Sequence, residues 1–217
     1  MRIACIGYRD WAFGIYEELM QDRRHVFLLI RGKEAYDESS LIDFKPDLVL
    51  FYGWSWIVGT ELLSRFVCLM LHPAPLPLYR GGSPIQNQII EGKSQSAVTL
   101  FVMTAEMDAG DIVGQTPLSL EGSLEEIFRR ITSAGVALTR RILAEGLVRI
   151  PQEHSKATYC KRRKPADSEI TPEELRTATA EYLYNKVRML AEPYPPAYIR
   201  THDGKRLLVR DVEIATD

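Results

Sequence analysis

Short apolar runs alternate with stretches of helical spacing along the first part of the chain, and this alternation restricts the fold more than any other feature. The runs Arg2–Gly7, His25–Ile30, Leu48–Tyr52 and Phe66–Leu71 have the length of buried strands. Between the first two, Ala12–Met20 repeats apolar side chains at helical spacing. Strands that alternate with helices in this way build βαβ units. The pattern therefore predicts an α/β fold with a mostly parallel sheet flanked by helices.

The middle of the chain continues the same pattern. Pro84–Glu91 is predicted to be helical and Val98–Met103 to be a strand, because the second segment is apolar and β-branched. Ser123-Leu-Glu-Glu126 is a capping box ahead of apolar residues at helical spacing. It predicts a helix that runs to about Ala144 and stops at Gly146.

The composition changes after residue 150. Pro151–Lys164 is polar and basic, which is typical of a linker, and Thr171 begins a capping signal for a helix through about Met189. Ala197–Arg200 and Arg206–Arg210 alternate apolar and polar residues around Asp203-Gly204, the signal of a two-residue hairpin turn. We therefore predict a catalytic domain in residues 1–150, and a linker, helix and small β-hairpin in 151–217.

Composition and charge exclude several classes of protein. Hydrophobic residues make up 46% and charged residues 26%, as in ordinary globular proteins, and the net charge of −2 offers no general attraction for nucleic acid. No apolar run is long enough to span a bilayer, and the first residues resemble a strand rather than a signal peptide. Cys5, Cys68 and Cys160 suggest neither a disulfide framework nor a zinc site. A cytoplasmic location is expected.

Two candidate catalytic residues follow predicted strands. One apolar strand ends at His72, and the prolines behind it would hold the imidazole in one orientation at the carboxyl end of the sheet, where ligands bind. The strand Val98–Met103 leads into a loop that carries Asp108, which could meet His72. A carboxylate beside an imidazole favours its protonated form. Singly, either residue would more commonly be structural, but the pair suits proton transfer.

These segments together resemble the formyltransferases that use 10-formyltetrahydrofolate. The resemblance covers about Lys45–Gly146 and is carried by motifs in a fixed order: His72-Pro-Ala-Pro-Leu-Pro-Leu-Tyr-Arg-Gly81, Pro84-Ile-Gln86, Val98-Thr99 and Met107-Asp-Ala-Gly-Asp-Ile112. It implies the Rossmann-like formyltransferase fold and transfer of a formyl group to an amine nitrogen. It also implies His72 and Asp108 as catalytic residues, 10-formyltetrahydrofolate as co-substrate and no metal.

The sequence departs from the family pattern at Met70. Members of the family normally have Asn two residues before the histidine, where its amide helps to hold the oxygen of the tetrahedral intermediate. A thioether cannot donate a hydrogen bond. Our hypothesis is that Gln86 or Asn87, or an ordered water, supplies the missing donor. The alternative is a homologue with weakened catalysis that only binds folate.

The resemblance also assigns binding residues. Phe51, Tyr52, Gly53 and Trp54, together with the loop Thr104, Ala105, Glu106, Met107 and Asp108, are expected to form the folate pocket. Packing is an equally good interpretation of Trp54. Tyr79, Arg80 and Gly81 are expected to form a flexible, positively charged lip near a substrate phosphate. The basic run Lys161–Lys164 is interpreted as a solvated face.

The substrate class follows from the resemblance and the charge. We expect a nucleotide-linked amino sugar of bacterial surface-polysaccharide biosynthesis, with a pathway of the pseudaminic acid type as the narrower expectation. The alternative is an enzyme like methionyl-tRNA formyltransferase, which acts on tRNA and normally carries a longer C-terminal domain. Neither a nucleic-acid partner nor a membrane is expected. Related sugar enzymes are often dimers, which makes Glu192–Val212 the expected contact between two copies.

Overall fold

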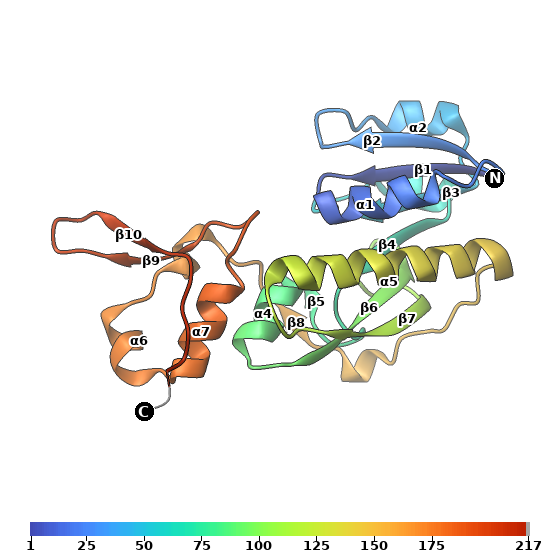
Figure 1. Cartoon of the computed structure of the whole chain (residues 1–217). Coiled ribbons are helices and arrows are strands. Elements are labelled where there is room, and N and C mark those ends of the chain that lie inside the picture. The colour runs from blue at the N-terminus through green and yellow to red at the C-terminus, as the bar shows by residue number, and fades with distance from the viewer. Residues whose placement is uncertain (216–217) are drawn as a thin grey trace.

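A six-stranded sheet forms the centre of the molecule in the structure, a computed structural model that describes residues 1–215 (Figure 1). Its strand order is β2-β1-β3-β4-β6-β7, in which β1 to β4 run parallel and β6 is antiparallel to both its neighbours. The prediction of a mostly parallel α/β sheet is confirmed. The strands are β1 (Arg2–Gly7), β2 (Val26–Arg31), β3 (Leu48–Tyr52), β4 (Cys68–His72), β6 (Gln95–Val102) and β7 (Ile112–Ser119).

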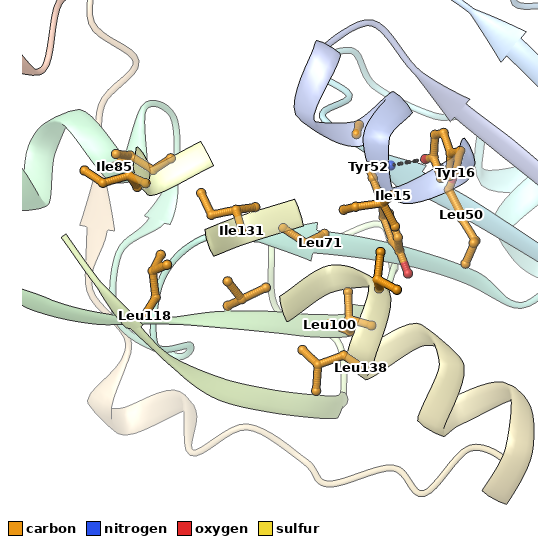
Figure 2. Close-up of a cluster of buried hydrophobic side chains, with 14 of the residues drawn as sticks. Ile15, Tyr16, Leu50, Tyr52, Leu71, Ile85, Leu100, Leu118, Ile131 and Leu138 are labelled. Atoms are coloured by element: carbon orange, nitrogen blue, oxygen red, sulfur yellow. Dashed lines mark hydrogen bonds between the residues drawn. The ribbon is translucent and has the colours of Figure 1, made fainter. Parts of the chain in front are cut away.

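Helices cover both faces of this sheet. On one face α1 (Asp10–Leu19) lies beside α5 (Leu124–Glu145), and their apolar sides join one buried cluster with the strands (Figure 2). On the other face a smaller cluster includes side chains of α2 (Glu38–Phe44) and α3 (Thr60–Arg65). Helix α5 begins with the predicted capping box at Ser123. The polar segment that forms α2 and the strand β7 were not predicted.

The buried hydroxyl of Tyr16 connects α1 to β1 and β3 through hydrogen bonds. Its hydroxyl accepts a hydrogen bond from the Tyr52 amide at 2.8 Å (Figure 2) and lies 2.8 and 2.9 Å from the carbonyl oxygens of Ile6 and Leu50. The hydroxyl is completely buried, so no water replaces it if it is removed. A buried amide without a partner keeps its full cost of desolvation.

We therefore expect Tyr16→Phe to lower the free energy of unfolding by about 1–3 kcal/mol. Urea denaturation measures this change. Tyr8→Phe is the matched control, because within the described residues 1–215 the Tyr8 hydroxyl bonds the Ser55 hydroxyl alone, at a partly buried position. Equal losses in the two variants would contradict the role given to Tyr16.

After α5 the chain returns along the sheet before it enters the C-terminal region (Figure 1). Residues 150–163, here called the strap, contain the short helix η1 (His154–Lys156) and β8 (Tyr159–Cys160). Strand β8 pairs with β5 (Arg80–Gly81), and Ile150 bridges to Ile112 at the start of β7. The segment predicted as a linker is thus paired with the sheet and with the loop behind His72. The division of the chain at residue 150 stays a prediction.

The C-terminal region corrects two sequence expectations. The single helix predicted from Thr171 to Met189 is two helices, α6 (Pro172–Thr177) and α7 (Ala180–Arg188), which follow η2 (Pro165–Ser168). The break occurs because Thr179 is extended and its side chain accepts from the Tyr182 amide, which starts a new helix. The hairpin β9 (Ala197–Arg200) and β10 (Arg206–Val209) is confirmed, but five residues, 201–205, connect its strands instead of two.

Strand β4 ends at the candidate catalytic residue His72, and β5 is followed by α4 (Pro84–Ile90). Helix α4 packs Ile85 and Ile89 into the larger cluster, which also contains side chains of the C-terminal region such as Val187. Within residues 1–215 no helix has the length and apolar character that crossing a membrane requires.

Candidate active site

His72 is the last residue of β4, at the end of a strand as the sequence predicted. Its side chain is 6% exposed, and its Nε2 lies 2.8 Å from the carbonyl oxygen of Tyr79. A carbonyl oxygen can only accept, so Nε2 carries a proton in this arrangement. The other ring nitrogen, Nδ1, lies 3.7 Å from Oδ2 of Asp108. In the neutral ring Nδ1 is therefore the nitrogen that can accept a proton, beside a carboxylate that stabilises the charge formed.

The path of the loop that brings Asp108 to His72 was not predicted from the sequence. Because β6 is antiparallel to β4, its last residues lie beside the start of β4, and the Met103 amide donates to the carbonyl oxygen of Cys68. The loop after β6 must return about 13 Å, the rise of four strand residues, to bring Asp108 to the end of β4. Asp108 has a φ of 50°, in the left-handed region.

The backbone of residues 79–81 joins the two candidate catalytic residues. The Tyr79 carbonyl contacts the imidazole of His72, and the Gly81 amide donates to Oδ2 of Asp108 at 2.7 Å. Gly81 has a φ of 102°, and a Cβ there would lie 2.5 Å from the carbonyl oxygen of Cys160. Glycine is thus required by both conformation and space. The structure brings His72 and Asp108 together, as the sequence suggested, and adds Gly81, which was expected in a substrate-binding lip.

Arg80 does not form the exposed, positively charged lip that was expected. The side chain is completely buried, and its guanidinium donates to Gln152 Oε1 at 2.7 and 3.2 Å. The expectation failed because β5 pairs with the strap, which covers this side chain. The Tyr79 hydroxyl points toward α4 and donates a hydrogen bond to the Glu91 carboxylate. Burial together with this hydrogen bond raises the pKa of Tyr79 to about 12.

A pocket of about 480 Å³ lies beside the loop that carries Asp108. Thr104 and Ala105 of the expected folate loop line it. The remaining lining residues come from the segment around α3, from the end of β6 and from Arg149: Thr60, Leu63, Ser64, Arg65, Phe66, Val67, Val102 and Met103. Its volume is in the range of small-molecule sites. The contribution of α3 to this pocket was not predicted, because α3 has no motif of its own.

The other residues predicted for the folate pocket lie elsewhere. Phe51 and Tyr52 are fully buried in β3, and the Tyr52 hydroxyl lies 2.9 Å from the Thr139 hydroxyl on α5. Trp54 is 7% exposed and packs against Tyr36, Phe51 and Trp56. The packing interpretation therefore fits Trp54 in this structure. Gly53, with a φ of 63°, makes the turn after β3.

The two candidate oxyanion donors differ in how their amides are used. Met70 lies two residues before His72 in β4, on the same face of the sheet. The Asn87 amide already donates to the carbonyl oxygens of Gly82 and Lys161. The Gln86 amide nitrogen is buried and has no hydrogen-bond partner among residues 1–215. Of the two side chains, only Gln86 holds an uncommitted donor.

In the part of the chain that the structure describes, no group of three or more His, Cys, Asp or Glu side chains is arranged to hold a metal ion. None of His72, Asp108 and Gly81 lines the pocket beside α3. The groups gathered at the end of β4 are an imidazole, a carboxylate and backbone amides. Such a set can accept a proton from a nucleophile and return it to a leaving group.

Comparisons with known proteins agree with the motifs. The formyl transferase family profile matches residues 31–143. Methionyl-tRNA formyltransferase of Geobacillus sp. (strain WCH70) is 33% identical over 177 residues, which are 78% of this chain and 54% of that protein. The chain thus spans about half the length of the curated relatives that it matches.

Solved structures repeat the fold over the whole chain. Methionyl-tRNA formyltransferase from Clostridium thermocellum is 30% identical, with a TM-score of 0.86 and coverage of 100% of both chains. A sugar N-formyltransferase from Shewanella sp FDAARGOS_354 has a TM-score of 0.78 at 17% identity, covering 100% of this chain and 99% of that one, and shares the fold. From the matched profile, the identities of 33% and 30% to the Geobacillus and Clostridium enzymes and the ordered motifs around His72 and Asp108, the chain belongs to the formyl transferase family.

Proposed function

We propose that the protein transfers a formyl group from 10-formyltetrahydrofolate to the amino group of a nucleotide-linked amino sugar. The observation that carries this proposal is the pairing of His72 with Asp108 at the end of β4, 3.7 Å from Nδ1 to Oδ2. The uncharged amine attacks the formyl carbon, and the C–N bond that forms leaves an oxyanion on the former carbonyl oxygen. Nδ1 of His72 takes the proton from the amine nitrogen.

The second half of the reaction reverses this proton transfer. Asp108 stabilises the imidazolium of His72, and the imidazolium gives its proton to N10 of the folate as the bond from N10 to the formyl carbon breaks. The products are a formamide and tetrahydrofolate, so atoms and charge balance without a metal. The Gly81 amide keeps Oδ2 of Asp108 in place during both steps, since it donates to that oxygen at 2.7 Å.

The pocket beside α3 supports folate as the donor. Its walls combine apolar side chains such as Leu63 and Phe66 with the backbone of Thr104 and Ala105, which suits a flat, polar-edged pterin. Thr104 is four residues from Asp108, a reach of at most about 14 Å of extended chain. The pocket does not include His72, so a folate bound there would have to extend along this loop to bring its formyl group to Nδ1 of His72.

The choice of acceptor rests on charge and on the shared fold. A net charge of −2 gives little attraction for a long polyanion, and the sugar N-formyltransferase from Shewanella matches the chain from end to end. The second candidate acceptor is an aminoacyl-tRNA, which the names of the relatives at 30–33% identity favour. Burial of Arg80 removes one expected phosphate contact and favours neither acceptor.

One assay tests the proposal. The protein is incubated with 10-formyltetrahydrofolate and either a panel of amino-sugar nucleotides or methionyl initiator tRNA, and tetrahydrofolate release is followed. We expect release with a sugar nucleotide. Release of tetrahydrofolate with tRNA alone would show that the acceptor is an aminoacyl-tRNA and not an amino sugar. Folate binding without release on any amine would show that the protein binds folate but does not transfer the formyl group.

The free amide of Gln86 leads to a prediction about the missing oxyanion donor. We expect Gln86→Leu to lower kcat about 10²-fold, the cost of one lost donor. Met70→Asn in the same chain is expected to restore most of this loss, since it returns the donor typical of the family. Asn87→Ala is the control variant, because the Asn87 amide already donates to the carbonyl oxygens of Gly82 and Lys161. Full activity of Gln86→Leu would exclude Gln86 as the helper.

A cytoplasmic location and a homodimer belong to the same proposal. Leu207 and Leu208 of β10 are 59% and 48% exposed, so the hairpin carries apolar side chains that a second copy could cover. A monomer in light scattering would remove this part of the proposal.

A further inference from the structure

The strap holds both sides of the candidate active site, although its sequence is that of a linker. On one side it pairs with the loop behind His72: the Arg80 amide donates to the Thr158 carbonyl, and the Gly82 amide donates to the Cys160 carbonyl. The Thr158 hydroxyl also accepts from the Tyr79 amide at 2.8 Å. These bonds fix the backbone whose carbonyl contacts His72 and whose amide contacts Asp108.

On the other side one strap residue, Gln152, reaches the loop of Asp108. Its Nε2 donates to the carbonyl oxygens of Asp108 and Gly110 at 2.9 and 2.7 Å. Its Oε1 accepts from the buried guanidinium of Arg80. The side chain is 5% exposed, so each polar atom of its amide is used and none is open to bulk water.

The conformation of the loop explains why these hydrogen bonds from Gln152 are needed. Asp108 has a φ of 50°, which an L residue with a side chain rarely adopts. Two residues later the backbone passes so close to Val102 that a Cβ on Gly110 would overlap the Val102 carbonyl oxygen. A tight, left-handed turn persists only when its surroundings hold it. Gln152 binds the carbonyl at each end of this turn.

We propose that Gln152 is a positioning residue that holds the turn at Asp108, so that its carboxylate faces Nδ1 of His72. Arg80 completes the unit, because its guanidinium fixes the Gln152 amide and carries further bonds to Tyr159 and His154 of the strap. The catalytic consequence rests on the proposed function, whereas the positioning of Asp108 does not. A displacement of about 1 Å in such a site can cost about 10²-fold in rate.

Gln152→Glu separates positioning from simple packing. The carboxylate keeps an acceptor for the buried Arg80 guanidinium and forms a close ion pair with it, so the strap stays folded. It loses both N–H donors and places an oxygen against the carbonyls of Asp108 and Gly110. Gln152→Leu removes both roles, and Gln95→Glu, at the exposed start of β6, is the matched control.

The first measurement needs no substrate. The Gly81 amide proton is held by Asp108, so its hydrogen exchange, followed by NMR, reports whether the carboxylate is in place. We expect exchange at Gly81 to be at least about tenfold faster in Gln152→Glu, with a melting temperature above that of Gln152→Leu, because an exchange rate follows local opening. Unchanged exchange at Gly81 would overturn the proposal, whatever the enzyme acts on.

The second measurement is kinetic and uses the acceptor found in the assay above. We expect kcat of Gln152→Glu to fall between about 10-fold and 10²-fold with KM within a factor of about two, because a positioning defect acts on the transition state. Normal kcat despite fast exchange would overturn the catalytic role. If the wild-type protein transfers formyl to no amine but exchange at Gly81 still accelerates, the proposed function fails and the positioning of Asp108 stands.

Discussion

His72→Asn is expected to lower kcat for formyl transfer by about 10²–10⁴-fold, the usual contribution of a general acid or base. Asparagine places its amide near the position of Nδ1, beside Asp108, but it has no nitrogen that accepts a proton. The amine would then have to lose its proton to water. Binding of 10-formyltetrahydrofolate is expected to stay within about threefold of wild type, because the pocket beside α3 does not include His72.

The matched control for this variant is His202→Asn, in the exposed connection between β9 and β10. Its kcat should equal that of the wild-type protein. Asp108→Asn is expected to show a loss of the same order as His72→Asn, and the double variant little more than either alone, since the two side chains act as one unit. Transfer at the wild-type rate by His72→Asn would refute the assignment of the catalytic base.

Glu174→Gln is expected to lower the free energy of unfolding by about 3 kcal/mol, because it leaves a buried ammonium without its counter-charge. The Lys186 side chain is 4% exposed, and its Nζ lies 2.6 Å from Glu174 Oε1 and 2.6 Å from the Glu169 carbonyl oxygen. Glu174 also caps α6 through the Thr171 amide. The glutamine keeps the size of the side chain but turns one acceptor oxygen into a donor, so the loss combines the charge with one hydrogen bond.

Urea denaturation measures this effect against Glu173→Gln, whose carboxylate pairs with Arg176 at an exposed position. A surface pair of that kind contributes at most about 1 kcal/mol. Adding Lys186→Met to Glu174→Gln should recover most of the lost stability, because a buried pair can be replaced by apolar groups at little cost. Equal losses in Glu173→Gln and Glu174→Gln would contradict the buried pair.

The same pair predicts a dependence on pH. Desolvation raises the pKa of Glu174, but the hydrogen bonds from Lys186 and the Thr171 amide outweigh it, and the net pKa is lowered. A carboxyl whose pKa is lower in the folded state stabilises the fold fully above its unfolded pKa, about 4.3, and loses this contribution as the pH falls through the folded value. As the pH is lowered below about 4, the free energy of unfolding of Glu174→Gln should therefore fall less than that of the wild-type protein.

Much of the fold and the centre of the site follow from local rules of the chain. Apolar periodicity predicted β1, β3 and β4 because buried parallel strands are continuous apolar runs. The capping box at Ser123 predicted the start of α5 because its bonds join residues three apart in sequence. The motif from His72 to Gly81 marked the end of β4, and the order of the motifs indicated the family. Each of these signals lies within a few neighbouring residues.

The rest depends on contacts between distant segments. The antiparallel direction of β6, and hence the returning loop of Asp108, is decided by pairing with β4 and β7. The burial of Arg80 and the clamp of Gln152 arise because the strap pairs with β5, about 80 residues earlier. Polar residues of the strap looked like a linker because sequence shows which groups can hydrogen-bond but not their partners. The sequence thus indicated the candidate catalytic pair, and pairing between distant segments alone decided what holds that pair in place.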